Sequence, residues 1–272
     1  MEDALRTVGN GGCGAWPLPG DPTCAGIARR TYRRVAGGLA LNPSLIDDGV
    51  TIVSELAANT LHVRGEDSPG DSELWLYLRG GGANRELVCK VFDAYPAWLN
   101  GTPGPNARVS SEALSGRGLG VVHELSGGHW GYHLTRARLG EEHLRGKAVW
   151  FAQPAPEPAV ALVPRQPGSP ETWSAAGEAM ARLEAGLAAR GFGPTLVRAD
   201  DGAADMAVLS VCGGVTLWCA DGVAWLRAPG SDGRRWGYGD LTELTEQTVE
   251  AYETTAGGTE IPRRAARLCV GA

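Results

Sequence analysis

Six prolines crowd a short stretch in the middle of the chain, and they constrain the fold more than any other sequence feature. They fall between Gln153 and Glu171. Proline lacks a backbone N–H and fixes φ, so neither a helix nor an inner strand is expected to pass through this stretch. The composition is typical of a semi-rigid linker. The sequence therefore predicts folded units at residues 1–153 and 171–272, joined by a proline-rich linker at 154–170.

Composition and charge narrow the class of protein. The 272 residues are 43% hydrophobic and 21% charged, which is typical of globular chains. A net charge of −6 without a long basic run argues against direct binding to nucleic acid. No stretch approaches the ~18 consecutive apolar residues of a membrane span, and the acidic first residues do not match a signal peptide. We therefore expect a cytoplasmic protein that does not enter membranes, with its six scattered cysteines reduced.

The pattern of the first unit predicts an antiparallel sheet with helices on one face. Asn42 followed by Pro43 is a strong helix start, because the asparagine caps a free N–H and proline has none to lose. Thr23 is expected to cap another helix. Apolar segments on either side of the turn at 80–82 predict a β-hairpin. The expected elements are helices at 23–37, 42–61 and 118–125 and strands at 73–79, 86–92, 130–139 and 147–152.

The sequence of the second unit predicts a smaller α+β domain, whose role is unknown. Gly213-Gly214 and Asp221-Gly222 are expected to form tight hairpin turns. The expected elements are helices at 173–191 and 241–254 and strands at 195–199, 206–212, 215–220 and 223–228. The whole chain is therefore predicted to be of the α+β class, a two-layer α/β sandwich followed by a small α+β unit.

Polar side chains lie on the outer face of the helix expected at 42–61. Glu55 and Asn59 are four residues apart, on the face opposite Ile46, Val50 and Val53. A solvated helix face is one interpretation of this pattern. The other is a site in which a carboxylate and an amide act together.

A second group of residues is typical of anion binding. Asp93 ends an expected strand, and a long loop then leads to Gly116–Gly120, which opens a helix. Glycines let the backbone approach an anion closely, and the N-terminus of a helix stabilises negative charge. The pattern predicts a phosphate site at Gly116–Gly120, with a plain glycine-rich loop as the alternative.

Taken together, residues 14–153 resemble the GHKL ATPases, whose ATP-binding domain has the Bergerat fold. Within that superfamily the chain is most similar to the bacterial anti-sigma-factor serine/threonine kinases. The resemblance rests on three segments that match the N, G1 and G2 boxes and on two flanking phrases. They are Glu55–Asn59, Val91–Asp93 and Gly116–Gly120, with Pro17–Asp21 and Gly146–Trp150.

The resemblance implies ATP and Mg²⁺ as ligands and assigns a role to each site residue. Asn59 would hold Mg²⁺ and Glu55 would be the general base. Asp93 would accept a hydrogen bond from the adenine amino group, beneath a lid at 98–115. The backbone of Gly116, Arg117, Gly118, Leu119 and Gly120 would bind the phosphates, with the Arg117 side chain offsetting their charge.

Departures from the family pattern leave two functions open. The G1 glycine is replaced by Tyr95, which is expected to crowd or stack on adenine, and a threonine near the adenine is replaced by Ala148. One expectation is a regulatory protein that binds ATP and Mg²⁺ and phosphorylates a serine or threonine of a protein partner. The alternative is a catalytically inactive, nucleotide-gated interaction scaffold.

A basic helix face is the expected partner surface. It consists of Arg29, Arg30, Arg33 and Arg34, with a solvated helix side as the other interpretation. The resemblance implies a sigma factor, an anti-sigma antagonist or another regulator as the partner and is compatible with a homodimer. His123, His129, His133 and His143 lie close in sequence but are not expected to bind metal.

Overall fold

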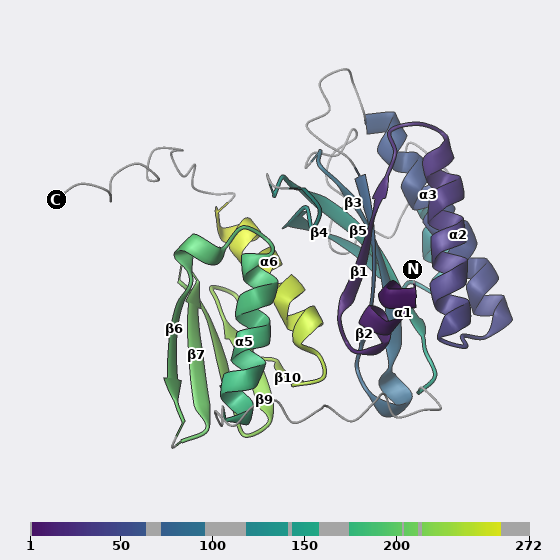
Figure 1. Cartoon of the computed structure of the whole chain (residues 1–272). Coiled ribbons are helices and arrows are strands. Elements are labelled where there is room, and N and C mark those ends of the chain that lie inside the picture. The colour runs from purple at the N-terminus through teal and green to yellow at the C-terminus, as the bar shows by residue number, and fades with distance from the viewer. Residues whose placement is uncertain are drawn as a thin grey trace.

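The computed structural model describes residues 2–63, 72–95, 118–140, 143–157, 174–202, 204–211 and 214–256. They form two antiparallel sheets with helices packed on them (Figure 1). We call the described part of residues 2–157 the N-terminal unit and that of residues 174–256 the C-terminal unit. Most of the predicted linker at 154–170 lies outside the described residues, so the linker remains a prediction.

The sheet of the N-terminal unit has the strand order β1-β2-β3-β5-β4, and each neighbouring pair is antiparallel. Because successive residues of a strand point to opposite faces, each strand contributes to two surfaces. Leu76 and Cys89 lie on the face that forms the main hydrophobic core, whereas Trp75 and Phe92 stack on the other. The strands are β1 (Cys13–Leu18), β2 (Ser72–Arg79), β3 (Glu86–Asp93), β4 (Trp130–Arg136) and β5 (Arg145–Pro154).

Three helices cover the core face of this sheet, as Figure 1 shows: α2 (Thr23–Gly38), α3 (Pro43–Val63) and α4 (Gly118–Leu125). The predicted start of α3 is confirmed, since Asn42 Oδ1 accepts from the Ser44 N–H at 3.0 Å. The prediction that Thr23 caps α2 is wrong. Asp21 Oδ1 instead accepts from the backbone N–H of Thr23 at 2.8 Å.

Gly49 allows α2 and α3 to pack closely. A Cβ at this position would lie 2.4 Å from the ring of Tyr32 on α2. Tyr32 is fully buried, and its hydroxyl donates to Gln153 Oε1 on β5. Burial raises the pKa of Tyr32 far above its ordinary value, so the hydroxyl stays protonated. These contacts fix α3, and the polar side chains it carries, against the sheet.

The C-terminal unit has the strand order β10-β9-β8-β7-β6, again antiparallel throughout. Asp221 and Gly222 both have positive φ, 51° and 76°, so the predicted tight turn between β8 and β9 is confirmed. Helix α5 (Ala175–Ala188) and helix α6 (Leu241–Ala256) pack on one face of this sheet. The strands are β6 (Val197–Asp201), β7 (Met206–Val211), β8 (Val215–Ala220), β9 (Val223–Arg227) and β10 (Arg235–Gly237).

Helices α5 and α6 lie between the two sheets (Figure 1). Within the N-terminal unit α2, α3 and α4 lie on one face of the sheet, as predicted, and the second face is covered by the C-terminal unit. Helix α6 lies against the second face of the first sheet, where Tyr77 donates to Glu243 and Lys90 donates to Glu246. Trp75 and Tyr77 are consequently fully buried. We call this contact between the units the seam.

Two strands were missed from the sequence. Residues 16–22 look like a proline-rich lead, yet Cys13–Leu18 form β1 at the sheet edge, where Pro17 is tolerated because a strand there needs fewer N–H donors. Strand β10 is too short to show alternation. Helix α1 (Glu2–Gly9) and the 3₁₀ turns at Gly82–Asn84 and Gly193–Thr195 complete the described elements.

Among the described residues, no helix combines the length and apolarity that a membrane crossing requires. Cys13, Cys89 and Cys219 are thiols rather than disulfides, as the sequence predicts for those three positions.

Candidate functional site

The polar side chains of α3 meet the N-terminus of α4. Glu55 and Asn59 lie one turn apart and are half-buried. A Cβ at Gly118, the first residue of α4, would lie 3.0 Å from Glu55 Oε2 and 3.3 Å from Asn59 Nδ2. Glycine is thus the residue that fits here without displacing either side chain. The structure brings the predicted base and the predicted magnesium ligand together with Gly118, the middle residue of the predicted phosphate turn.

The start of α4 favours an anion. The first N–H groups of a helix have no partner within the helix, and the helix dipole places partial positive charge there. The first turn of α4 carries no acidic residue. Leu119 and Val122 are buried in the core and anchor the helix, so Leu119 offers its backbone rather than its side chain. A Cβ at Gly120 would meet nothing within 4 Å, which leaves open space beside the turn.

Asp93 lies at the end of β3, and its carboxylate is ion-paired. Lys147 Nζ on β5 donates to Asp93 Oδ2 at 2.9 Å and to the Tyr95 carbonyl at 2.5 Å. The Tyr95 N–H donates to Asp93 Oδ1 at 3.0 Å. The side chains of Asp93 and Lys147 are 11% and 6% exposed. These contacts fix the orientation of the carboxylate, whose oxygens each have a second lone pair for a further donor.

Lys147 was missed from the sequence, and Ala148 was assigned in its place. Residues alternate along β5, so Lys147 shares the core face with Val149 and Phe151, whereas Ala148 points to the other face. There Ala148 packs with Trp75 and Phe92. Ala148 therefore lies on the face of the sheet opposite to Asp93 and Lys147, and its expected place beside the adenine stays a prediction. Counting every second residue of β5 back from the core residues Phe151 and Val149 would have placed Lys147 on the same face as Asp93.

Other predicted site residues are placed apart or lie outside the described part. Gly116 and Arg117 lie outside it, as does the predicted lid at 98–115, so their roles remain predictions. Tyr95 is 40% exposed, and its ring centre is 5.7 Å from Lys147 Nζ. Its backbone therefore holds Asp93 and Lys147, while its ring faces outward.

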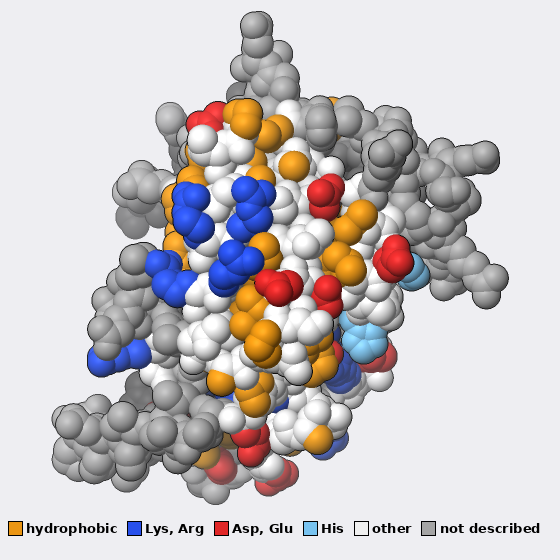
Figure 2. All heavy atoms as spheres, turned by 90° about the vertical axis from the view of Figure 1, so that its right-hand side faces the viewer, with side chains coloured by type: hydrophobic (Ala, Val, Ile, Leu, Met, Phe, Trp, Pro, Cys, Tyr) orange, Lys and Arg blue, Asp and Glu red, His pale blue; other side chains and the backbone are white. Residues whose placement is uncertain are grey.

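The arginines of α2 form a solvent-exposed basic patch on the helical face of the N-terminal unit, where Figure 2 shows the blue side chains gathered. Arg29 donates to Ser54 Oγ of α3 at 2.7 Å, and Arg33 lies 3.5 Å from Asp47. Arg30 and Arg34 are exposed as well. The patch is available for a partner, but its role stays a prediction.

The described histidines do not assemble a metal site. Among the residues the structure describes, no group of three or more His, Cys, Asp or Glu side chains could hold a metal ion. His123 accepts from Trp130 Nε1, whereas His133 is buried in the seam.

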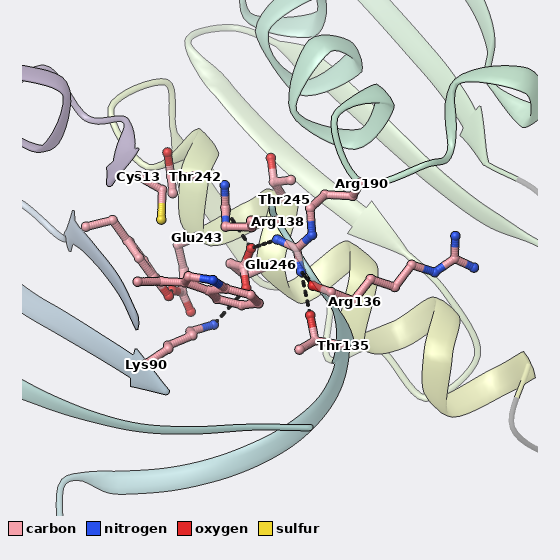
Figure 3. A network of polar contacts seen from close by, with 12 residues as sticks. Cys13, Lys90, Thr135, Arg136, Arg138, Arg190, Thr242, Glu243, Thr245 and Glu246 are labelled. Carbon is pink, nitrogen blue, oxygen red and sulfur yellow. Dashed lines mark hydrogen bonds and ion pairs between the residues drawn. The ribbon is translucent and has the colours of Figure 1, made fainter. Parts of the chain in front are cut away.

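The seam holds a second polar cluster, centred on Glu246 of α6 (Figure 3). Glu246 Oε2 accepts from Lys90 Nζ at 3.1 Å, and Oε1 accepts from Arg138 at 2.7 Å. Arg190, which follows α5, also donates to Glu246 and reaches Thr135 on β4 at 2.6 Å. Three cations therefore converge on one fully buried carboxylate.

Further carboxylates of α6 repeat the pattern along the seam. Glu243 accepts from the Tyr77 hydroxyl at 2.6 Å. Glu253, one to two turns beyond Glu246, accepts from both Arg136 and Arg145. The carboxylates belong to α6, and their partners belong to the first sheet and its β4–β5 connection.

Burial and charge shift the pKa values in the cluster. Burial would raise the pKa of Glu246, but the ion pairs with Arg190, Lys90 and Arg138 outweigh it and hold the pKa well below its usual range. Burial, aided by Lys90, lowers the pKa of His133 to about 3. His133 is therefore neutral, with Nδ1 donating to the Leu134 carbonyl and Nε2 accepting from Lys90 at 3.0 Å.

Neither a family model nor a curated protein matches the sequence significantly. The function is therefore argued from the geometry of the site.

Proposed function

We propose that the protein binds ATP and Mg²⁺ and acts as a regulatory protein of the kind represented by the anti-sigma-factor serine/threonine kinases. The observation that carries the proposal is the contact of Gly118 with Glu55 and Asn59 at the N-terminus of α4. It combines a glycine cradle, a helix N-terminus, an amide and a carboxylate. This set suits a magnesium-bound phosphate group.

Each residue has a definite task in this proposal. The amide oxygen of Asn59 would hold Mg²⁺, and the backbone N–H groups at the start of α4 would hold phosphate oxygens. Asp93, oriented by Lys147, would accept from the amino group of adenine. When bound, Mg²⁺ would offset the charge of the phosphates.

Glu55 is the candidate general base. Its Oε2 lies where a Cβ on Gly118 would touch it, so it is adjacent to the predicted phosphate turn. A carboxylate there would accept the proton of an attacking hydroxyl, from a serine or threonine of a protein partner or from water. The remaining rate acceleration would come from positioning of the reactants and from electrostatic stabilisation of the transition state.

A scaffold without catalysis is the second candidate function. The Asp93–Lys147 ion pair is compatible with it, because Asp93 keeps a lone pair for adenine whether or not catalysis follows. Nucleotide binding would then gate an interaction, for which the arginine patch of α2 is the candidate surface.

Calorimetric titration with Mg-ATP tests nucleotide binding. We expect the wild type to bind and Asn59→Ala to lose most of the affinity. Gly118→Ala should weaken binding about tenfold, because the new methyl displaces Glu55 and Asn59. Gly120→Ala is the matched control, since its Cβ meets open space. A wild type that binds no nucleotide, or equal affinities for the two alanine variants, would refute the site.

Glu55→Ala then separates the two functions. For a kinase, the variant keeps nucleotide affinity but loses phosphoryl transfer or hydrolysis. For a scaffold, wild type and Glu55→Ala are equally inactive while both bind nucleotide.

A further inference from the structure

The hydrophobic clusters of the described residues stop at the seam. The main core of the N-terminal unit draws on residues 8–155, and that of the C-terminal unit on residues 176–252. Two small clusters lie on the sheet face under α6, around Trp75 and Tyr77, and their members all come from the N-terminal unit. Each of the two main cores is therefore built from one unit alone, whereas the small clusters around Trp75 and Tyr77 are covered by the C-terminal unit. Burial of apolar surface in a core is the main source of cohesion in a folded domain.

Ion pairs and hydrogen bonds make up much of the seam. Glu243, Glu246 and Glu253 contact tyrosine, lysine and arginine side chains of the N-terminal unit. Buried ion pairs contribute little net stability, because removing charges from water offsets most of their attraction. Interfaces of this polar kind between domains allow relative motion. The seam therefore has the composition of a contact that opens while both units stay folded.

The charges that meet across the seam differ in sign between its two sides, although the first sheet also buries the carboxylate of Glu73, which accepts from Trp75 Nε1. Apart from Arg190, the cations that meet the α6 carboxylates come from the N-terminal unit: Arg79, Lys90, Arg136, Arg138 and Arg145. The same face holds several aromatic rings, among them Trp75 beneath Arg138 and Tyr77 beneath Lys90. Aromatic and arginine side chains of this kind dominate protein-binding surfaces.

We propose that this face of the first sheet is a binding surface for acidic amphipathic helices. Helix α6 occupies it in cis, and an acidic helix of a protein partner binds there when the C-terminal unit is released. The partner helix would present carboxylates at the spacing of Glu243, Glu246 and Glu253, because these positions match the cations of the face. The proposal does not depend on nucleotide binding.

Opening of the seam is tested on the wild-type chain with two adjacent residues. Lys90 faces the seam and Cys89 faces the main core, so they lie on opposite faces of β3. Acetylation of Lys90 and alkylation of Cys89 are followed by mass spectrometry, each relative to its rate in the denatured chain. We expect Lys90 to be at least tenfold less protected than Cys89, with the difference increasing at high salt. Equal protection of the two would show that the seam opens only on unfolding and would overturn the proposal.

Binding of an acidic helix is tested with a fluorescent peptide of residues 240–256. The full chain carrying Glu243→Gln, Glu246→Gln and Glu253→Gln should bind it at least tenfold more tightly than the wild type does, and less tightly as salt rises. A peptide with the same three glutamines is the control and should bind at least tenfold more weakly. Equal binding of the two peptides, or no binding by a folded variant, would overturn the proposal.

Two further results also decide the matter. If the triple variant does not fold, the protection of Lys90 in the wild type supports or overturns the proposal. A wild-type dimer in which Lys90 stays protected would assign the face to a second copy of the chain, and would overturn an acidic partner.

Discussion

Replacement of Glu246 by glutamine removes the charge that holds the seam together. The substitution keeps the shape of the side chain and one acceptor oxygen. It leaves Lys90, Arg138 and Arg190 around a neutral group, although the carboxylate is fully buried and contacts all three. Removing one partner of a buried ion pair costs about 3–5 kcal/mol. We expect a loss of that size in the free energy of unfolding.

Differential scanning calorimetry at pH 7 measures the effect. In a chain of this size, 1 kcal/mol corresponds to a shift of about 2–4 °C in Tm. The midpoint of the transition that includes the seam should therefore fall by roughly 6–20 °C. Because the two units have separate cores, we also expect the transition to broaden or split.

Glu250→Gln is the matched control on the same helix. Burial raises the pKa of Glu250, so its charge at pH 7 opposes folding. Glutamine at this position should leave Tm unchanged or raise it slightly. A Glu246→Gln protein that melts within about 2 °C of the wild type would refute the assigned role of the ion cluster.

Three further predictions follow from described contacts. His133 has a pKa of about 3 in the folded chain, so below pH ~6.5 only the unfolded chain takes up a proton at this residue. The free energy of unfolding, measured by urea titration, should therefore fall by about 2 kcal/mol from pH 7 to pH 5. An equal fall in a His133→Gln variant would contradict this. Lys147→Met should destabilise the chain by about 3 kcal/mol and show a coupling of about 2 kcal/mol with Asp93→Asn in a double-mutant cycle, whereas additive effects would exclude the ion pair. Gly49→Ala should lower the free energy of unfolding by about 1–3 kcal/mol, although alanine has the better helix propensity, because the new Cβ overlaps a buried tyrosine ring. Gly37→Ala is the control, because its Cβ meets nothing within 4 Å, and it should stabilise the chain by up to about 1 kcal/mol. Thermal unfolding measures both variants.

Local signals predicted much of the fold. The Asn42-Pro43 start and the apolar period identify α3, and the glycine turn locates α4. The resemblance to the GHKL ATPases, rather than these signals, assigned Glu55, Asn59 and Gly118 to one site. These signals act within a few residues and do not depend on the rest of the fold. Strand β1 carried no such signal, because Pro17 hides its edge position.

The seam could not be predicted in the same way. Glu243, Glu246 and Glu253 share one side of α6, and this spacing is equally typical of a solvated helix face. Their partners in the N-terminal unit lie more than 100 residues away: 156 separate Lys90 from Glu246. Only the relative placement of two sheets decides between water and cations as neighbours. Lys147 is a different case, because strand alternation places it on the core face beside Asp93 and no motif of the sequence marked that contact.

The position of α6 near the C-terminal end has a consequence for synthesis of the chain. The ribosome releases the first sheet well before α6 exists, and 166 residues separate Tyr77 from the Glu243 that accepts its hydrogen bond. Until α6 is translated, the nascent N-terminal unit exposes these aromatic rings and arginines to solvent. Contacts of such high sequence separation form late and slowly. Chaperone binding or premature termination would therefore act on an intermediate that already has its main core but lacks α6.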